Sequence, residues 1–145
     1  MIESVEEFKR LRESENPDEY LRAAHEEAPM SVWKTIIDQY PDLRFWVAQN
    51  KTVPIEILKI LAKDGSSQVR GMVARKRKID EEIKDLLVKD PDAGVRNDLA
   101  WNAKLEPEYL KILAKDSEAL VRESALNKLS QQIGGHNSGG CAPCA

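Results

Sequence analysis

Apolar residues recur along the chain at the spacing of amphipathic helices. Ile57, Ile60 and Leu61 stand at i, i+3 and i+4, which places them on one side of a helix. In a second type of segment, Val95 and Leu99 lie four residues apart. The alternation typical of strands is absent. The pattern predicts an all-α protein.

The helical segments repeat with a period of 26 residues. Conserved residue types recur at this step, and a pair of helices this short cannot cover its own apolar face. The period therefore predicts a right-handed α-solenoid in which each two-helix repeat stacks on the next. The clearest columns are Arg44, Arg70, Arg96, Arg122; Asp64, Asp90, Asp116; Glu56, Glu82, Glu108; Leu61, Leu87, Leu113; and Val69, Val95, Val121.

The register of these columns predicts the limits of one helical-repeat domain over 1–133. Its parts are N-terminal capping helices (1–29), a degenerate repeat with a two-residue deletion (30–50), and regular repeats at 51–76, 77–102 and 103–133. Residues 134–145 are rich in Gly, Ser and Cys, which predicts a flexible tail.

Polar residues at the expected helix starts support this division. Ser4 and Glu7 have the spacing of a capping box, and Asn16 precedes a proline suited to the first helical position. Asp90 precedes Pro91 in the same way, and Asp64 and Asp116 occupy the equivalent place. We therefore expect this aspartate column to cap the second helix of each repeat.

The sequence resembles a known repeat family. The pattern Val-Arg-x-x-Val-Ala-x-(Asn/Lys), with Glu-(Ile/Tyr)-x-x-(Ile/Leu)-Leu-(Ala/Val)-Lys-Asp, is similar to leucine-rich repeat variants over about residues 30–130. It is also similar to HEAT repeats, which share an Asp followed by Val-Arg but are longer than 26 residues. The resemblance implies an α-solenoid that binds another macromolecule on its concave or edge surface.

Composition narrows the class of protein. The 145 residues are 41% hydrophobic and 32% charged, and no apolar run approaches the roughly 20 residues that span a bilayer. Residues 1–20 lack the apolar stretch of a signal peptide, so a cytoplasmic location is expected and no membrane partner. The net charge of −3 disfavours a nucleic-acid partner and permits a basic protein.

The arginine column has two interpretations. It could form a positive stripe for phosphate groups. Alternatively, each guanidinium could bond the aspartate six residues before it, or the next aspartate along the chain, and so hold the stack together. We favour the second, because a column that does not vary usually serves the repeat itself.

Variable columns on the second helices are better candidates for binding. Trp101 stands where other repeats have Gln49, Arg75 or Asn127, so the fold does not require an aromatic there. Trp and Arg are also enriched at interface hot spots. Local packing is the alternative for Trp101 and Trp46. The residues predicted to contact a partner are Phe45, Trp46, Gln49, Met72, Arg75, Asn97, Asp98 and Trp101.

The basic run Arg75, Lys76, Arg77 and Lys78 is the alternative site. It follows a predicted helix end, where cations complement the helix dipole, and three acidic residues come directly after it. A solvated turn is the simpler interpretation. Binding of nucleic-acid phosphate or of an acidic protein surface is the other.

Residues that would support catalysis or metal binding are sparse. His25 is the only histidine in the predicted domain, and phosphate-binding glycine loops and nucleophile motifs are absent. Cys141 and Cys144 have the spacing of half a redox or zinc site, but they lie in the predicted tail, which could also be an expression remnant. We expect no enzymatic activity, cofactor, metal or small-molecule substrate.

These observations predict a non-catalytic module that binds a protein through its variable second-helix surface. A narrower hypothesis is a bacterial immunity or inhibitor protein for a basic toxin. The alternative is a nucleic-acid-associated module that uses the basic run and the arginine column.

Overall fold

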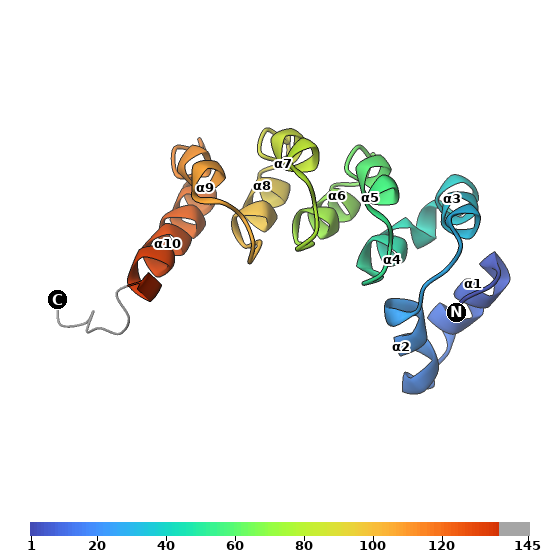
Figure 1. Ribbon diagram of the computed structural model, residues 1–145. Helices are drawn as coiled ribbons and strands as arrows, with labels where there is room; N and C mark the ends of the chain where they lie inside the picture. The colour runs from blue at the N-terminus through green and yellow to red at the C-terminus, as the bar shows by residue number, and fades with distance from the viewer. Residues whose placement is uncertain (137–145) are drawn as a thin grey trace. The chain divides into compact units, whose positions relative to one another are not determined.

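The predicted all-α class is confirmed by a computed structural model, which describes residues 1–136. These residues form ten α-helices and one 3-10 helix, without a strand among them (Figure 1). The chain divides into two compact units, Met1–Val73 (unit 1) and Ala74–Ala145 (unit 2). Each unit is described by itself.

Unit 1 contains the first helices of the chain. Helix α1 packs against α2 and α3, and α4 packs against α2, α3 and α5. The side chains of Phe8 and Trp33 meet edge to face in the core, with ring centroids 5.5 Å apart. The helices are α1 (Val5–Glu13), α2 (Pro17–His25), α3 (Met30–Gln39), η1 (Pro41–Leu43), α4 (Arg44–Gln49), α5 (Ile55–Leu61) and α6 (Ser67–Ala74), whose last residue begins unit 2.

The starts of α1 and α2 agree with the predicted caps. The Ser4 hydroxyl accepts a hydrogen bond from the Glu7 backbone N–H, and the Asn16 side chain accepts one from Asp18. The Glu7 carboxylate returns the bond to the N–H of Glu3 at 2.8 Å, one residue earlier than a standard capping box. Both ends of the first turn are thus satisfied.

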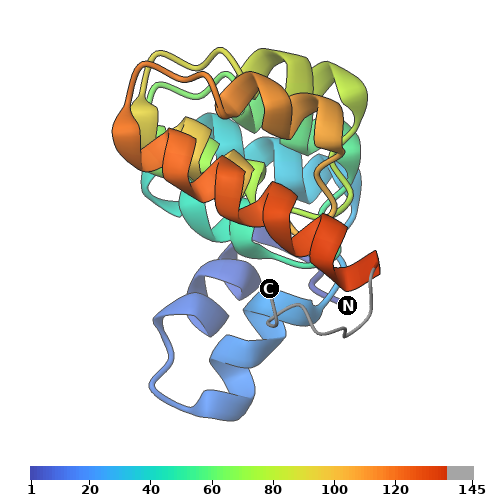
Figure 2. The same cartoon turned by 90° about the vertical axis from the view of Figure 1, so that its left-hand side faces the viewer.

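Unit 2 contains four complete helices, and the last is the longest. Helix α10 packs along both α8 and α9, and Figure 2 shows it as one continuous helix. It continues to His136, three residues into the predicted tail, whereas Cys141 and Cys144 lie outside the described residues. The helices are α7 (Glu81–Leu87), α8 (Ala93–Ala100), α9 (Pro107–Leu113) and α10 (Ala119–His136).

The apolar stripe of α5 differs from the prediction at one position. Ile57, Leu58 and Leu61 are buried, but Ile60 is 49% exposed. The predicted assignment of Ile60 to the core was therefore wrong. The helix is rotated so that Leu58, one residue after Ile57, faces the core instead.

The helix cap expected of Asp90 is formed by Asp92. The Asp92 carboxylate accepts hydrogen bonds from the N–H groups of Gly94 and Val95 and caps α8. Asp90 instead accepts a bond from the N–H of Asp92 at 2.9 Å. The predicted N-cap was wrong by two residues, because the aspartate forms a side-chain turn that leads into the cap.

Two buried asparagines hold the loops that follow α4 and α8. Asn50 donates to the carbonyl oxygens of Ala23 and Glu26 at 2.8 and 3.0 Å. Asn102 donates to those of Ala74 and Lys76 at 2.7 and 2.8 Å. Each amide oxygen also accepts a bond from the backbone N–H two residues later. The same device therefore occurs once in each unit.

Candidate functional site

Trp101 is the most exposed aromatic side chain in the part of the chain that the structure describes. It follows α8 as its C-cap, and its side chain is 53% exposed. Its backbone N–H bonds to carbonyl groups at the end of α8, which fixes the position of the indole ring's attachment. A large apolar surface is thus presented to solvent on a well-held backbone.

Asp98 and Arg75 form an ion pair in the same unit. Asp98 precedes Trp101 by three residues, so both lie on the same side of α8. The Asp98 carboxylate accepts from Nε and Nη2 of Arg75 at 2.9 and 2.8 Å. The arginine side chain is 60% exposed, and a pair this open contributes at most about 1 kcal/mol to stability. We call Arg75, Asp98 and Trp101 the Trp101 surface.

The neighbouring column is less accessible than the sequence suggested. Asn97 is half-buried, and its side-chain oxygen is buried without a hydrogen-bond partner. Gly71, at the equivalent position in unit 1, is buried. The predicted exposed face of two adjacent columns therefore reduces in unit 2 to the exposed Arg75 and Trp101 with the half-buried Asp98.

The predicted residues of unit 1 mainly pack against one another. The Phe45 and Trp46 rings meet edge to face at 5.0 Å, and the Arg12 guanidinium lies 3.6 Å from the Trp46 ring centroid. Trp46, Gln49 and Met72 are all half-buried. The packing interpretation of Trp46 is thus the better one.

The basic run lies in the turn after α6 and is part of the local structure. The side chain of Arg75 is held by Asp98, and the Lys76 carbonyl accepts from Asn102. Arg77 and Lys78 are exposed. The run therefore takes part in folding unit 2, and two of its four members are held in polar contacts.

The arginine column serves the scaffold. Arg96 donates to the Asp90 carbonyl at 2.6 Å and to both oxygens of the Asp116 carboxylate at 2.7 and 3.1 Å. Arg44 bonds the Asp64 carboxylate at 3.2 Å, across the same 20-residue separation. Hydrogen bonding to Asp116 raises the pKa of Arg96, and Arg96 lowers the pKa of Asp116. These bonds bear out the scaffold interpretation.

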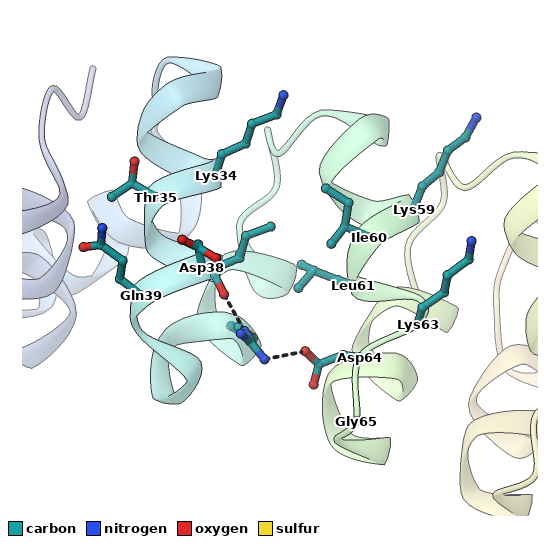
Figure 3. A pocket seen from close by; sticks show the side chains of 12 residues that line it. Lys34, Thr35, Asp38, Gln39, Lys59, Ile60, Leu61, Lys63, Asp64 and Gly65 are labelled. Atoms are coloured by element: carbon teal, nitrogen blue, oxygen red, sulfur yellow. Dashed lines mark hydrogen bonds and ion pairs between the residues drawn. The ribbon is translucent and has the colours of Figure 1, made fainter.

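A groove that the sequence did not reveal lies between α3 and α5 in unit 1. Its volume is about 860 Å³. Figure 3 shows Ile60 reaching from α5 toward α3, while Lys34 and Lys63 extend outward from opposite sides. The exposed isoleucine at a predicted core position was the signal that could have indicated it. We call this the α3–α5 groove, lined by Lys34, Thr35, Ile37, Asp38, Gln39, Arg44, Lys59, Ile60, Leu61, Lys63, Asp64 and Gly65.

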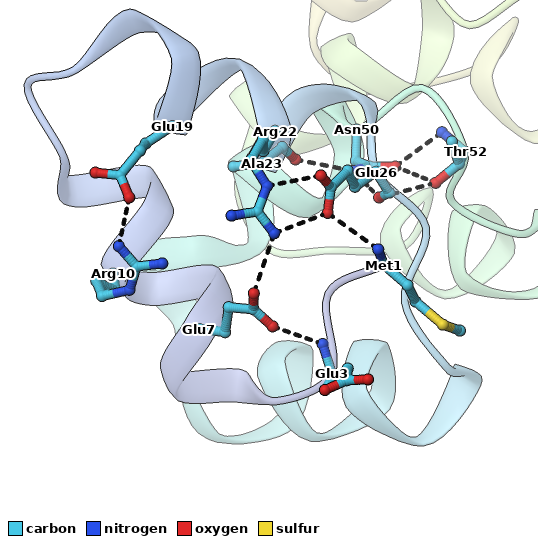
Figure 4. A network of polar contacts seen from close by, with 10 residues as sticks. All are labelled: Met1, Glu3, Glu7, Arg10, Glu19, Arg22, Ala23, Glu26, Asn50 and Thr52. Carbon is cyan, nitrogen blue, oxygen red and sulfur yellow. Dashed lines mark hydrogen bonds and ion pairs between the residues drawn. The ribbon is translucent and has the colours of Figure 1, made fainter.

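A network of ion pairs ties the first helices together (Figure 4). Arg22 donates to the carboxylates of Glu26 at 2.6 Å and Glu7 at 3.1 Å, and the Met1 amino group lies 3.3 Å from Glu26. These bonds lower the pKa of Glu26, chiefly through Arg22, and that of Glu7, chiefly through the backbone N–H of Glu3. The network has a structural role, because both carboxylates are already engaged.

A second polar group links α7 to α9 in unit 2. The Lys84 amino group, on a side chain only 10% exposed, lies 2.8 Å from Glu106, and the Tyr109 hydroxyl donates to Asp85 at 2.8 Å. Burial, followed by the bond to Asp85, raises the pKa of Tyr109. Lys84 lowers the pKa of Glu106. A phenol held protonated in this way acts as a hydrogen-bond donor between the helices.

Metal ligands do not gather anywhere in the described residues. Within them, no group of three His, Cys, Asp or Glu side chains is placed to hold a metal ion. His25 is exposed, as the sequence predicted. None of the helices within 1–136 has the length and apolar character to cross a membrane.

The accessible features are thus the Trp101 surface in unit 2 and the α3–α5 groove in unit 1. Comparison of the chain with protein-family models, with curated proteins and with solved structures finds no match.

Proposed function

We propose that this chain is a non-catalytic protein-binding module, built as a solenoid of 26-residue repeats, and that the Trp101 surface contacts the partner. The observation that supports it most is the 53% exposure of Trp101 at a position where the equivalent residues are polar. An indole this exposed adds nothing to the core, so its cost is best explained by a binding role.

Equivalent contacts in the two units support the repeat architecture. The bond from Arg44 to Asp64 has its counterpart in that from Arg96 to Asp116, and both span 20 residues. The buried Asn50 and Asn102 are 52 residues apart, which is two periods, and bond the chain in the same manner. A repeat stabilised by neighbouring repeats predicts such recurrence.

The surroundings of Trp101 suit a protein interface. Asp98 and Arg75 offer a carboxylate and a guanidinium beside the indole, so a partner can add hydrogen bonds around an apolar anchor. Little side-chain ordering is lost on binding, because Arg75 is already held by Asp98.

The net charge of −3 favours a basic partner. An immunity protein that blocks a basic toxin is a specific form of this proposal.

The test is capture of the partner on the purified chain after nuclease treatment, followed by a dissociation constant measured with the purified partner. Because hot-spot truncation costs at least about 2 kcal/mol, Trp101→Ala should weaken binding by roughly thirtyfold. Ile112→Ala is the matched control, since Ile112 is 55% exposed on α9 and should leave binding unchanged.

Two results would contradict the proposal. Equal affinities for wild type and Trp101→Ala would remove the indole from the interface. Captured material that disappears with nuclease, and binding lost on replacing Arg77 and Lys78, would instead indicate a nucleic-acid partner.

A further inference from the structure

The α3–α5 groove has the dimensions of a binding site rather than of a packing defect. Its volume of about 860 Å³ lies within the range of sites that bind small molecules or short peptide segments. It lies wholly within unit 1, and its walls come from two helices and the turn after α5. The groove is therefore a separate feature from the Trp101 surface.

An aliphatic side chain stands exposed inside this groove. Ile60 is 49% exposed and points from α5 toward α3 (Figure 3). The buried Ile37 and Leu61 also line the groove, from α3 and α5. An aliphatic side chain of a ligand placed against Ile60 would complete this apolar strip and remove it from water.

The charge of the groove is opposite to that of the whole chain. Its lining includes four cationic side chains against two carboxylates, a formal excess of two positive charges, whereas the chain carries −3. Arg44 and Asp64 neutralise each other through their ion pair. Lys34 and Lys63 are exposed and extend from opposite walls, with one exposed carboxylate, Asp38, between them.

We propose that the α3–α5 groove binds an acidic peptide segment of a partner protein, with one aliphatic side chain against Ile60 and carboxylates beside Lys34 and Lys63. The apolar strip favours a peptide over a nucleic acid, because the lining has no aromatic ring on which a base could stack. This site does not depend on the Trp101 surface, and the partner may be tested without knowing its name.

The test is selection from a random library of short displayed peptides on the full chain. We expect enrichment of sequences that place Asp or Glu on both sides of Leu, Ile, Val or Met. The most enriched peptide, labelled and titrated by fluorescence anisotropy, should bind roughly tenfold more weakly to the double variant Lys34→Glu/Lys63→Glu. Ile60→Ser should weaken it by a similar factor, about one buried side chain's contribution.

Matched controls separate the groove from general effects of charge and polarity. Lys104→Glu/Lys115→Glu makes the same change in net charge at exposed positions of unit 2, and Ile112→Ser makes the same polar substitution on α9. Both should bind the peptide as wild type does. All variants alter exposed side chains, and circular dichroism verifies that each remains folded.

Three outcomes would overturn the proposal: no acidic enrichment, equal loss of binding in the groove and control variants, or displacement of the peptide by a single-stranded oligonucleotide at equal charge. The Trp101→Ala variant should retain the peptide. Loss of binding in that variant, with retention in Lys34→Glu/Lys63→Glu, would assign the peptide to the Trp101 surface and refute the groove site. Failure at the groove would leave the test of the Trp101 surface unaffected.

Discussion

Two asparagines five residues apart in unit 2 have opposite effects on stability. Asn102 is 2% exposed, and its amide makes three hydrogen bonds to backbone groups. Asn97 has a buried side-chain oxygen that lacks a partner among the described residues. A buried polar atom without a partner has a desolvation cost that no bond offsets.

We therefore expect Asn102→Ala to lower the free energy of unfolding by about 2–3 kcal/mol, because three backbone groups lose their partner. Asn97→Ala should change it by less than about 1 kcal/mol, or raise it, since alanine also favours a helix. Urea titrations followed by circular dichroism measure both values. A larger loss in Asn97→Ala than in Asn102→Ala would contradict this assignment.

Single residues were also where the sequence distinguished least between candidate sites. Trp46 and Trp101 stand in similar contexts of the 26-residue pattern, yet Trp46 stacks on Arg12 while Trp101 faces solvent. Arg12 lies 34 residues before Trp46 in the sequence, so the periodic pattern contains no sign of their contact. Contacts of this kind arise from tertiary packing and cannot be predicted from spacing.

At the scale of helices, the sequence predicted much more. The all-α class, the starts of α1 and α2 and most core positions followed from periodicity and capping residues. The stripe of α5 was ambiguous, because Ile57 and Leu61 share a face that can be extended by either Leu58 or Ile60. A helix of seven residues has too few turns for periodicity to decide between them.

Substitution of these isoleucines separates the two faces of α5. Ile57→Ala should lower the free energy of unfolding by about 2–5 kcal/mol, as expected for a fully buried side chain. Ile60→Ala should change it by less than about 0.5 kcal/mol, as for most surface substitutions. Chemical denaturation of the two variants provides the comparison, and similar losses in both would place Ile60 in the core after all.

At the scale of the molecule, carboxylates in both units depend on ion pairs or backbone bonds for their charged state. The pKa values of Glu7, Glu19 and Glu26 in unit 1, and of Glu106 and Asp116 in unit 2, are lowered from ordinary values of 4.5 for Glu and 3.8 for Asp. A group with a lowered pKa in the folded state binds protons more readily when unfolded, so acid favours unfolding.

The stability contributed by these carboxylates should thus be fully present above about pH 5 and decline as the pH falls through their lowered pKa values. Asp116→Asn should be less stable than wild type at pH 7 and lose less on acidification, because its bond to Arg96 is already weakened. Melting temperatures between about pH 7 and pH 3 test this. Glu108→Gln, at an exposed position, is the control, and parallel acid profiles for all three proteins would be the contrary result.

The positions of the three tryptophans give each unit its own optical signal. Trp33, 1% exposed in the core, and Trp46 belong to unit 1, whereas Trp101 is the sole tryptophan of unit 2 and faces water already. A red shift of indole emission during denaturation therefore reports chiefly on unit 1, while far-ultraviolet ellipticity reports on the helices of both. Replacing Trp101 by Phe would leave fluorescence to unit 1 alone, and the two halves of the chain could then be followed separately without an added dye.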